Sequence, residues 1–334
     1  MLKQISLLIL CAAAIVLFAT PVQACTSAVV SGKVTPDGRP LLWKNRDTDF
    51  MRNHIDYVKG EKYNFIAVVN SANAYLKEAW MGTNSAGFAL MNTQSYNLVD
   101  IKGDEERGAA NGRVIYRALE VCATVADFCY FLDTISKPSD IEANFGVIDA
   151  QGGAAMFEVD YYKYVMYDAN NPKDAPYGYI ARTNFSFAGK VNEGAGYVRY
   201  MEADQVLMKA SATGSITPQF IFNDLSRSFR NRMLDIDLRS GAYNRPQASG
   251  WFVDQDFIPR SSTSCSVVVQ GVKPGEKAEL TTMWTLLGYP PTGIAIPLWV
   301  KDAGKLLPGM VRFGKEHEAA PLSDWSLRLA DRVF

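Results

Sequence analysis

Cys25 is the residue of this 334-residue chain whose surroundings best suit a nucleophile. It stands in PVQACTSAVV, directly after Ala24 and close to the end of a long apolar run. A free thiol has a pKa near 8.5, so a nucleophilic cysteine needs a neighbouring group that accepts its proton. The usual acceptor is histidine, but the chain has only His54 and His317, and neither lies in a catalytic motif. We therefore expect both histidines to be structural or solvated, and the proton acceptor to be another group.

The first 24 residues have the features of a secretory signal. Lys3 supplies a positive charge, residues 5–18 form an apolar core, and Val22-Gln23-Ala24 resembles a signal-peptidase site. The apolar core is shorter than the roughly 20 residues that span a bilayer. We expect residues 1–24 to be removed by signal peptidase, the protein to be exported to the periplasm or the extracellular space, and no stable membrane anchor to remain.

Cleavage after Ala24 would free the backbone amine of Cys25. An α-amino group has a pKa near 7.7–8.0, so it can accept the proton of the thiol on its own residue. A protein that matures in this way needs no histidine for its nucleophile. Cys25 is therefore the predicted first residue of the mature chain and its predicted catalytic residue.

Composition excludes several classes of partner. The 34 basic and 35 acidic side chains nearly cancel, which argues against nucleic acid as a partner. Few histidines and no clustered cysteines argue against a zinc site, and we expect neither metal nor cofactor.

Cys122 lies on an apolar helical stripe and Cys265 in a strand-like segment, so both are predicted core residues. The sequence does not decide whether Cys122 and Cys129 form a disulfide.

The hydrophobic pattern predicts strands, helices, strands, helices and strands in that order. The predicted strands are 26–32, 41–47, 62–70, 76–82, 87–96, 144–149, 154–168, 178–185, 264–270, 280–287 and 294–300, and the predicted helices are 111–135, 197–210 and 217–232. Thr124 and Asp127 have capping-box spacing, which divides 111–135 into two helices. This order is not the alternation of a parallel doubly wound sheet. It predicts one α+β domain over residues 25–334, in which helices cover two mainly antiparallel sheets.

Four motifs carry a family resemblance. CTSAVVSGKVTPDGRPLLWKNRDTD, from Cys25 onward, resembles the start of the mature linear-amide hydrolases of the N-terminal nucleophile (Ntn) superfamily. These enzymes include choloylglycine (bile salt) hydrolases, penicillin V acylases and penicillin-forming acyltransferases. GTNSAGFALMN (82–92), ANFGVIDAQGGAAMFEVD (143–160) and RTNF (182–185) resemble later elements of the same family, in the same order. The resemblance implies a four-layer αββα sandwich.

The resemblance also implies a set of catalytic residues. Cys25 would be the nucleophile, and Asp47, in the Asn-x-Asp element, would hydrogen-bond to its α-amine. Asn92, at the end of the second motif, would line the oxyanion site. The side-chain amide of Asn184 would face the same oxyanion.

A second set of residues is predicted to contact the substrate. Lys44 stands where bile salt hydrolases carry an arginine, so it keeps the charge without the planar fork. Arg260 is the candidate for a second family arginine, with a surface salt bridge as the alternative. Trp80 belongs to a group of aromatic residues that predicts an apolar pocket: Trp80, Tyr96, Phe185, Phe187, Trp251 and Phe252.

The predicted function is hydrolysis of a linear amide, of the N-acyl amide or conjugated bile salt type, through a thioester on Cys25. The expected binding partner is then a small-molecule acyl amide substrate. The sequence leaves open whether the protein forms an oligomer. Two alternatives within the superfamily are a dipeptidase-like enzyme and an acyltransferase. A third alternative is a non-catalytic binding lipoprotein in which Cys25 carries the lipid.

Overall fold

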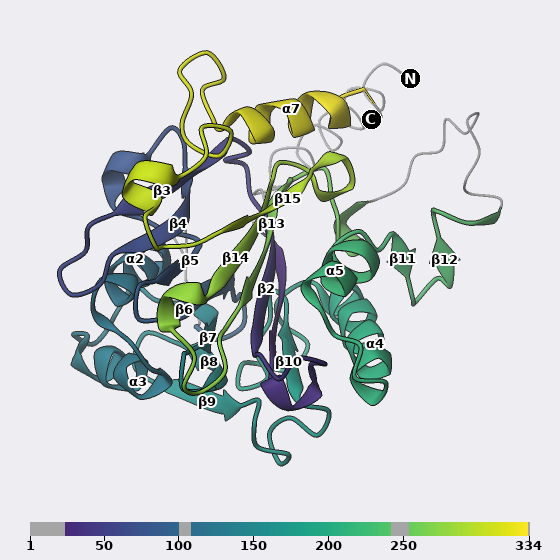
Figure 1. Ribbon diagram of the computed structural model, residues 1–334. Coiled ribbons are helices and arrows are strands. Elements are labelled where there is room, and N and C mark those ends of the chain that lie inside the picture. Colours follow the sequence, from purple (N-terminus) through teal and green to yellow (C-terminus); the bar gives the residue numbers. More distant parts are fainter. Residues whose placement is uncertain (1–23, 100–107, 242–253, 333–334) are drawn as a thin grey trace, which may run out of the picture.

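The computed structural model of the chain describes residues 24–99, 108–241 and 254–332. Apart from Ala24, the expected signal peptide lies outside the described residues. Figure 1 shows two sheets packed beside each other, with α2 and α3 outside one sheet and α4 and α5 outside the other. All strand pairs in the two sheets are antiparallel.

The first sheet has six strands and contains Cys25. Its strands, in spatial order, are β10 (Tyr179–Arg182), β1 (Cys25–Val30), β2 (Leu41–Asp47), β13 (Thr263–Gln270), β14 (Thr282–Leu287) and β15 (Ala295–Leu298). The helix α4 (Tyr197–Ala212) and the short α5 (Pro218–Phe220), continued by the π-helical turn Ile221–Leu225, cover its outer face.

The second sheet has seven strands in sequence order. They are β3 (Asn53–Val58), β4 (Phe65–Asn70), β5 (Met81–Asn84), β6 (Ala89–Gln94), β7 (Ala143–Ile148), β8 (Ala154–Val159) and β9 (Tyr164–Asp168). Its outer face packs against α2 (Asn111–Val121) and α3 (Val125–Thr134). A capping box of Thr124 and Asp127 begins α3, as its spacing predicts.

The alternation of side chains along the strands explains the layers. In β2, Leu42 packs into the core between the sheets, while Leu41 and Trp43 pack under α4 and α5. In β4, Ile66 and Val68 face the inter-sheet core, and their neighbours face α2 and α3. Each sheet is thus apolar on both faces and needs a cover on both. The α+β class and the four-layer αββα sandwich are confirmed.

Several predicted elements differ from the observed ones. The strand predicted at 154–168 is a hairpin, because the Asp160 carboxylate accepts hydrogen bonds from the backbone of Tyr162 and Lys163 and turns the chain. The helix predicted to reach 232 ends at Leu225, and β11 (Arg230–Asn231) then pairs with β12 (Ile236–Asp237). Two C-terminal helices, α6 (Ala303–Leu306) and α7 (Pro321–Ala330), were not predicted.

The cysteines other than Cys25 are structural. Cys122 lies in the core beneath α2 and Cys265 in the core between the sheets, as the apolar pattern predicts. All four cysteines of the described residues, Cys129 included, are free thiols.

Gly82, in β5, tests how tightly α2 packs on the second sheet. A Cβ at this position would lie 2.6 Å from the Ile66 carbonyl oxygen and 2.8 Å from Leu119 Cδ1. Because the oxygen is backbone, it cannot move aside easily. We expect Gly82→Ala to lower the free energy of unfolding by about 1–3 kcal/mol in urea titrations. Gly309→Ala is the control, since no atom lies within 4 Å of its added Cβ; equal stability of the two variants would contradict this packing.

Candidate active site

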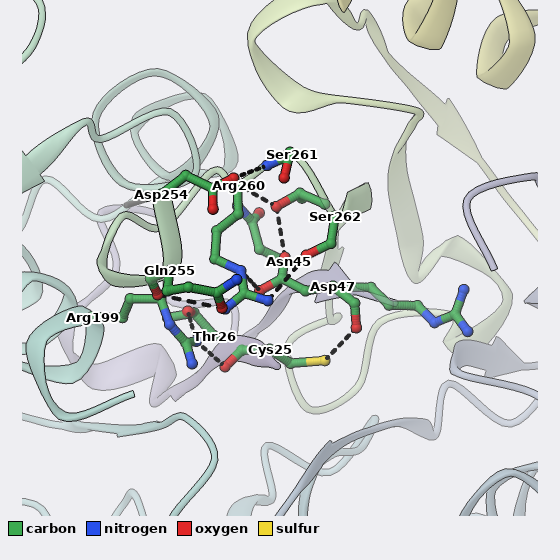
Figure 2. Close-up of polar contacts among 12 residues, drawn as sticks. Cys25, Thr26, Asn45, Asp47, Arg199, Asp254, Gln255, Arg260, Ser261 and Ser262 are labelled. Carbon is green, nitrogen blue, oxygen red and sulfur yellow. Dashed lines mark hydrogen bonds and ion pairs between the residues drawn. The ribbon is translucent and has the colours of Figure 1, made fainter. Parts of the chain in front are cut away.

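Cys25, the first residue of β1, lines a cavity of about 470 Å³. Its side chain is 6% exposed. Figure 2 shows the sulfur directed toward the backbone oxygen of Asp47, at 3.9 Å. The other walls come from β2, from β6, from the chain before β5 and from the start of α2. The nucleophile predicted from sequence is therefore buried at a cavity wall and not on an open surface.

Lys44 and Arg46 lie on the same face of the sheet as Cys25. Cys25 is paired with Arg46, and Ser27 with Lys44, in the antiparallel register of β1 and β2. Directly opposed residues point to one side of a sheet, and so do alternate residues of one strand. Both cationic side chains consequently line the cavity.

Lys44 fixes the orientation of the Asn92 amide. Its Nζ donates to Asn92 Oδ1 at 3.0 Å and to the Trp80 backbone oxygen at 3.1 Å. An ammonium group can only donate, so the atom of Asn92 that faces Lys44 must be the oxygen. Burial lowers the pKa of Lys44 to about 8. Among the described residues, no acceptor is bonded to Asn92 Nδ2, which leaves this donor available to the cavity.

The nitrogen of Cys25 is held by Asn184. In the described chain this nitrogen is the amide that joins Cys25 to Ala24, and it donates to Asn184 Oδ1 at 2.9 Å. Asn184 Nδ2 in turn donates to the Gln94 backbone oxygen at 2.8 Å. Asn184 does not line the cavity. The structure therefore places its amide at the Cys25 nitrogen, and not at the oxyanion position that the resemblance implied, because both ends of the amide have protein partners.

Arg199, from α4, holds the same group of atoms from the other side of the sheet. Its guanidinium donates to the Cys25 backbone oxygen at 2.6 Å and to Thr26 Oγ1 at 2.9 Å (Figure 2). It also donates to Asn184 Oδ1 at 2.8 Å. The side chain is fully buried, and burial lowers its pKa to about 10. A positive charge thus lies next to the backbone of Cys25.

The Asp47 carboxylate does not contact the Cys25 nitrogen, which corrects the contact that the resemblance implied. Asp47 Oδ1 accepts from Thr263 Oγ1 at 2.6 Å, and Oδ2 lies 3.3 Å from Arg260 Nε. Asp47 follows Arg46 on β2, so its side chain leaves the strand on the opposite face from that of Cys25. Burial raises the pKa of this carboxyl, and the charge of Arg260 opposes that rise.

Arg260 is a buried partner of Asp47. Its guanidinium also donates to Gln255 Oε1 at 2.5 Å and to Ser262 Oγ at 3.0 Å (Figure 2). Arg260 is buried and does not line the cavity, so its ion pair with Asp47 is not a surface salt bridge, and the substrate contact stays a prediction.

The aromatic residues expected around Cys25 fall into two groups. Trp80 and Tyr96 line the cavity, whereas Phe185 and Phe187 stack on each other and contact Tyr200 edge-to-face. Trp251 and Phe252 lie outside the described residues. Phe50 and Leu76 complete the apolar part of the cavity wall.

Neither histidine lies at this cavity. His54 Nδ1 is 3.0 Å from Ser71 Oγ, and His317 Nδ1 is 2.8 Å from Asp324 Oδ2. Larger cavities of about 510, 750 and 840 Å³ exist among the described residues, but no cysteine lines any of them. The described part of the chain holds no group of three or more His, Cys, Asp or Glu residues arranged to bind a metal.

Within the three described ranges, no helix has both the length and the apolar character required to cross a bilayer.

A protein-family model described as acyl-coenzyme A:6-aminopenicillanic acid acyl-transferase matches residues 34–210, more than half of the chain. The chain belongs to this acyl-transferase family. The match confirms the resemblance to penicillin-forming acyltransferases. The matched segment of the acyl-transferase family includes Lys44, Asp47, Asn92 and Asn184, and begins after Cys25.

Three solved structures are similar to the chain at low identity. An N-acylethanolamine-hydrolyzing acid amidase ortholog from Caenorhabditis elegans is 16% identical, covers 60% of this chain and 89% of its own, and has a TM-score of 0.41. A conjugated bile acid hydrolase variant from Clostridium perfringens is 14% identical. The match covers 82% of this chain and 92% of the hydrolase chain, with a TM-score of 0.44. Penicillin V acylase from Agrobacterium tumefaciens is 15% identical. The match covers 83% of this chain and 86% of the acylase chain, with a TM-score of 0.42. A comparison with curated protein sequences finds no match.

Two residues near Cys25, Arg46 and Arg199, were not predicted from the sequence. Arg46 stands inside the Asn-x-Asp element, and its position opposite Cys25 follows from the hairpin register. Arg199 lies in the amphipathic segment YVRYMEAD, where a charged residue normally indicates a solvated helix face. Only the tertiary packing of α4 on β1 places it at Cys25.

The depressed pKa of Lys44 predicts a specific pH dependence of stability. The folded chain loses the Lys44 proton near pH 8 and the unfolded chain only near its ordinary value of 10.5. The unfolded state therefore binds more protons over this window, and stability rises with pH across it. Relative to Lys44→Met, we expect the parent to gain about 2 kcal/mol of unfolding free energy between about pH 7.5 and 9.5.

Urea unfolding of both proteins at several pH values measures this difference. Lys305→Met, which removes a solvent-exposed lysine of α6, is the control and should differ from the parent by the same amount at every pH. A pH-independent difference for Lys44→Met would show that Lys44 does not lose its proton in this range.

Proposed function

We propose that this chain hydrolyses linear amides, with Cys25 as an N-terminal nucleophile after removal of residues 1–24. The observation that carries the proposal is the position of Cys25 at a cavity wall, with its nitrogen held by the Asn184 amide and by no histidine. Residues 25–334 would then be one exported catalytic domain, located in the periplasm or outside the cell. Membership of an acyl-transferase family supports acyl transfer as the reaction type.

In the proposed reaction the Cys25 amine takes the thiol proton, and the sulfur attacks the amide carbon. Asn92 Nδ2, oriented by Lys44, donates to the oxyanion, an interaction worth about 3–4 kcal/mol in comparable sites. The carbon–nitrogen bond breaks as the leaving amine accepts the proton from the Cys25 ammonium. Water, deprotonated by the same amine, then cleaves the thioester and releases the acid.

Asn184 and Arg199 act in this proposal as positioning residues. Asn184 orients the nitrogen through its Oδ1, and Arg199 holds both Asn184 and the Cys25 carbonyl. A neighbouring positive charge disfavours the ammonium form, so Arg199 favours the free amine that the reaction needs. Asp47, paired with Arg260, supports the strand end that carries the site.

The burial of Cys25 argues against the lipoprotein alternative. A diacylglycerol group on the sulfur would have to occupy the cavity that the substrate needs, and could not reach a membrane without opening the sheet end. Acyl transfer to an amine remains the second candidate, because the matching family is described by such an activity. Formation of a new amide when a primary amine is added would establish it.

The first test is a panel of amides with the mature chain. We expect amine release from at least one of the conjugated bile salts, penicillin V, N-acyl amino acids and N-acyl ethanolamines. Cys25→Ala should lower the rate by a factor on the order of 10³ or more, and Cys25→Ser should be severely impaired. Cys129→Ala, which removes the free thiol of α3, should retain the parent rate. A Cys25→Ala rate within a few-fold of the parent rate would disprove the role of Cys25.

The second test concerns the amine. In a chain extended before Cys25, the nitrogen is an amide without useful basicity, so the thiol lacks its proton acceptor. We expect a folded chain with a permanent N-terminal tag to be inactive. The same chain cut to begin at Cys25 should be active, with a rate that rises between about pH 6 and 8 as the amine loses its proton. Equal rates for the two forms would mean that the amine is not the base.

A further inference from the structure

Two buried cations line the cavity beside Cys25 without a carboxylate partner among the described residues. Arg46 is 3% exposed and donates to Asn53 Oδ1 at 2.5 Å and to Asn70 Oδ1 at 2.8 Å. Lys44 is 2% exposed, and its partners at Asn92 and Trp80 are also neutral oxygens. Buried charges in proteins are normally paired with an opposite charge, so both side chains are unusual.

The two acidic residues among those that line the cavity, Asp47 and Glu78, already lie next to other arginines, and the Asp47 carboxylate is on the opposite face of the sheet. Asp47 pairs with Arg260 at 3.3 Å, and Glu78 lies 3.6 Å from Arg113. The described wall of the cavity therefore carries excess positive charge. Burial lowers the pKa of both Lys44 and Arg46, which is the expected effect on cations that lack a strong counter-charge.

Arg46 is also held in a fixed orientation. Its two hydrogen bonds reach β3 and β4 in the second sheet, and its guanidinium carbon lies 4.7 Å from the centre of the Trp80 ring. These contacts use two of its five N–H donors. A planar guanidinium with free donors is well suited to a carboxylate or sulfonate, and its preorganisation reduces the entropic cost of binding.

We infer that Arg46, together with Lys44, binds an acid group of the amide substrate close to the scissile bond, and so selects anionic amides over neutral ones. The site lies close to that bond because Arg46 is directly opposite Cys25 in the sheet. The identification of the ligand as a substrate rests on the proposed hydrolysis, whereas the anion site itself does not. The acid group can belong to the amine half or to the acyl half of the amide.

Calorimetry with the mature Cys25→Ala chain measures binding without turnover. The ligands are N-octanoylglycine, with the acid on the amine half; the mono-octylamide of succinic acid, with the acid on the acyl half; and neutral N-octanoylethanolamine. We expect at least one acid to bind about tenfold or more tightly than the neutral amide, equivalent to about 1.4 kcal/mol. Equal binding of all three would overturn the inference.

Arg46→Met in the same background should reduce the preference for the acid to about twofold or less. Arg46→Lys, which keeps the charge but loses the planar fork, should give an intermediate preference. Arg227→Met is the matched control, because its guanidinium also donates to neutral oxygens, those of Pro290 and Gly293, and lines a different cavity. An unchanged preference in Arg46→Met would mean that Arg46 only links the sheets.

Turnover by the mature parent chain separates this inference from the proposed function. An acidic amide that binds preferentially but is not cleaved would refute the hydrolysis and leave the anion site intact. Cleavage of acidic and neutral amides with equal kcat/KM would support the hydrolysis and refute the anion site. If Arg46→Met fails to fold, the comparison of the three ligands on the parent background still decides the inference.

Discussion

The antiparallel register between β1 and β2 determines what faces Cys25. Because side chains alternate along a strand, pairing Cys25 with Arg46 directs the side chains of Arg46 and Lys44 into the cavity and the Asp47 carboxylate to the opposite face of the sheet. A shift of one residue would reverse these faces and place Asn45 and Asp47 beside the thiol. The register itself is fixed by burial, since Leu42 must reach the core between the sheets while Trp43 packs under α4 and α5.

The same arrangement places several charges in a poorly solvated region. Lys44, Arg46, Arg199 and Arg260 are all buried within one sheet end, and among the described residues only Arg260 faces a carboxylate directly. Such burial is costly unless each donor has an acceptor, and here most acceptors are amide or backbone oxygens. Charges kept in a protein at this cost are often functional, which is why we assign them to amine activation and anion binding.

The sequence could predict the layers and the position of Cys25 at a cavity, but not all contacts of Cys25. Period-two alternation and the capping box at Thr124 depend on local residues, so the strands and the helices α2 and α3 were recognisable. The motifs placed Lys44 and Asn92, and the group of aromatic residues placed Trp80, at the cavity together with Cys25. The partner of the Cys25 nitrogen depends instead on which face of β2 carries Asp47 and on how α4 packs, and neither is visible in a motif. Arg199 was missed for the same reason.

The contacts around the Cys25 nitrogen suit both the extended and the proposed mature chain. While Ala24 is attached, the nitrogen has one hydrogen, and Asn184 Oδ1 accepts it. An amine formed by cleavage keeps this acceptor. Its nitrogen then has a free lone pair, and this nitrogen belongs to the same residue as the thiol. Arg199 lies close enough to bond the Cys25 carbonyl, so its charge opposes protonation of that amine. On this view removal of the preceding residues changes the chemistry of one nitrogen and leaves the surrounding hydrogen bonds in place, so that maturation requires no rearrangement of the sheet.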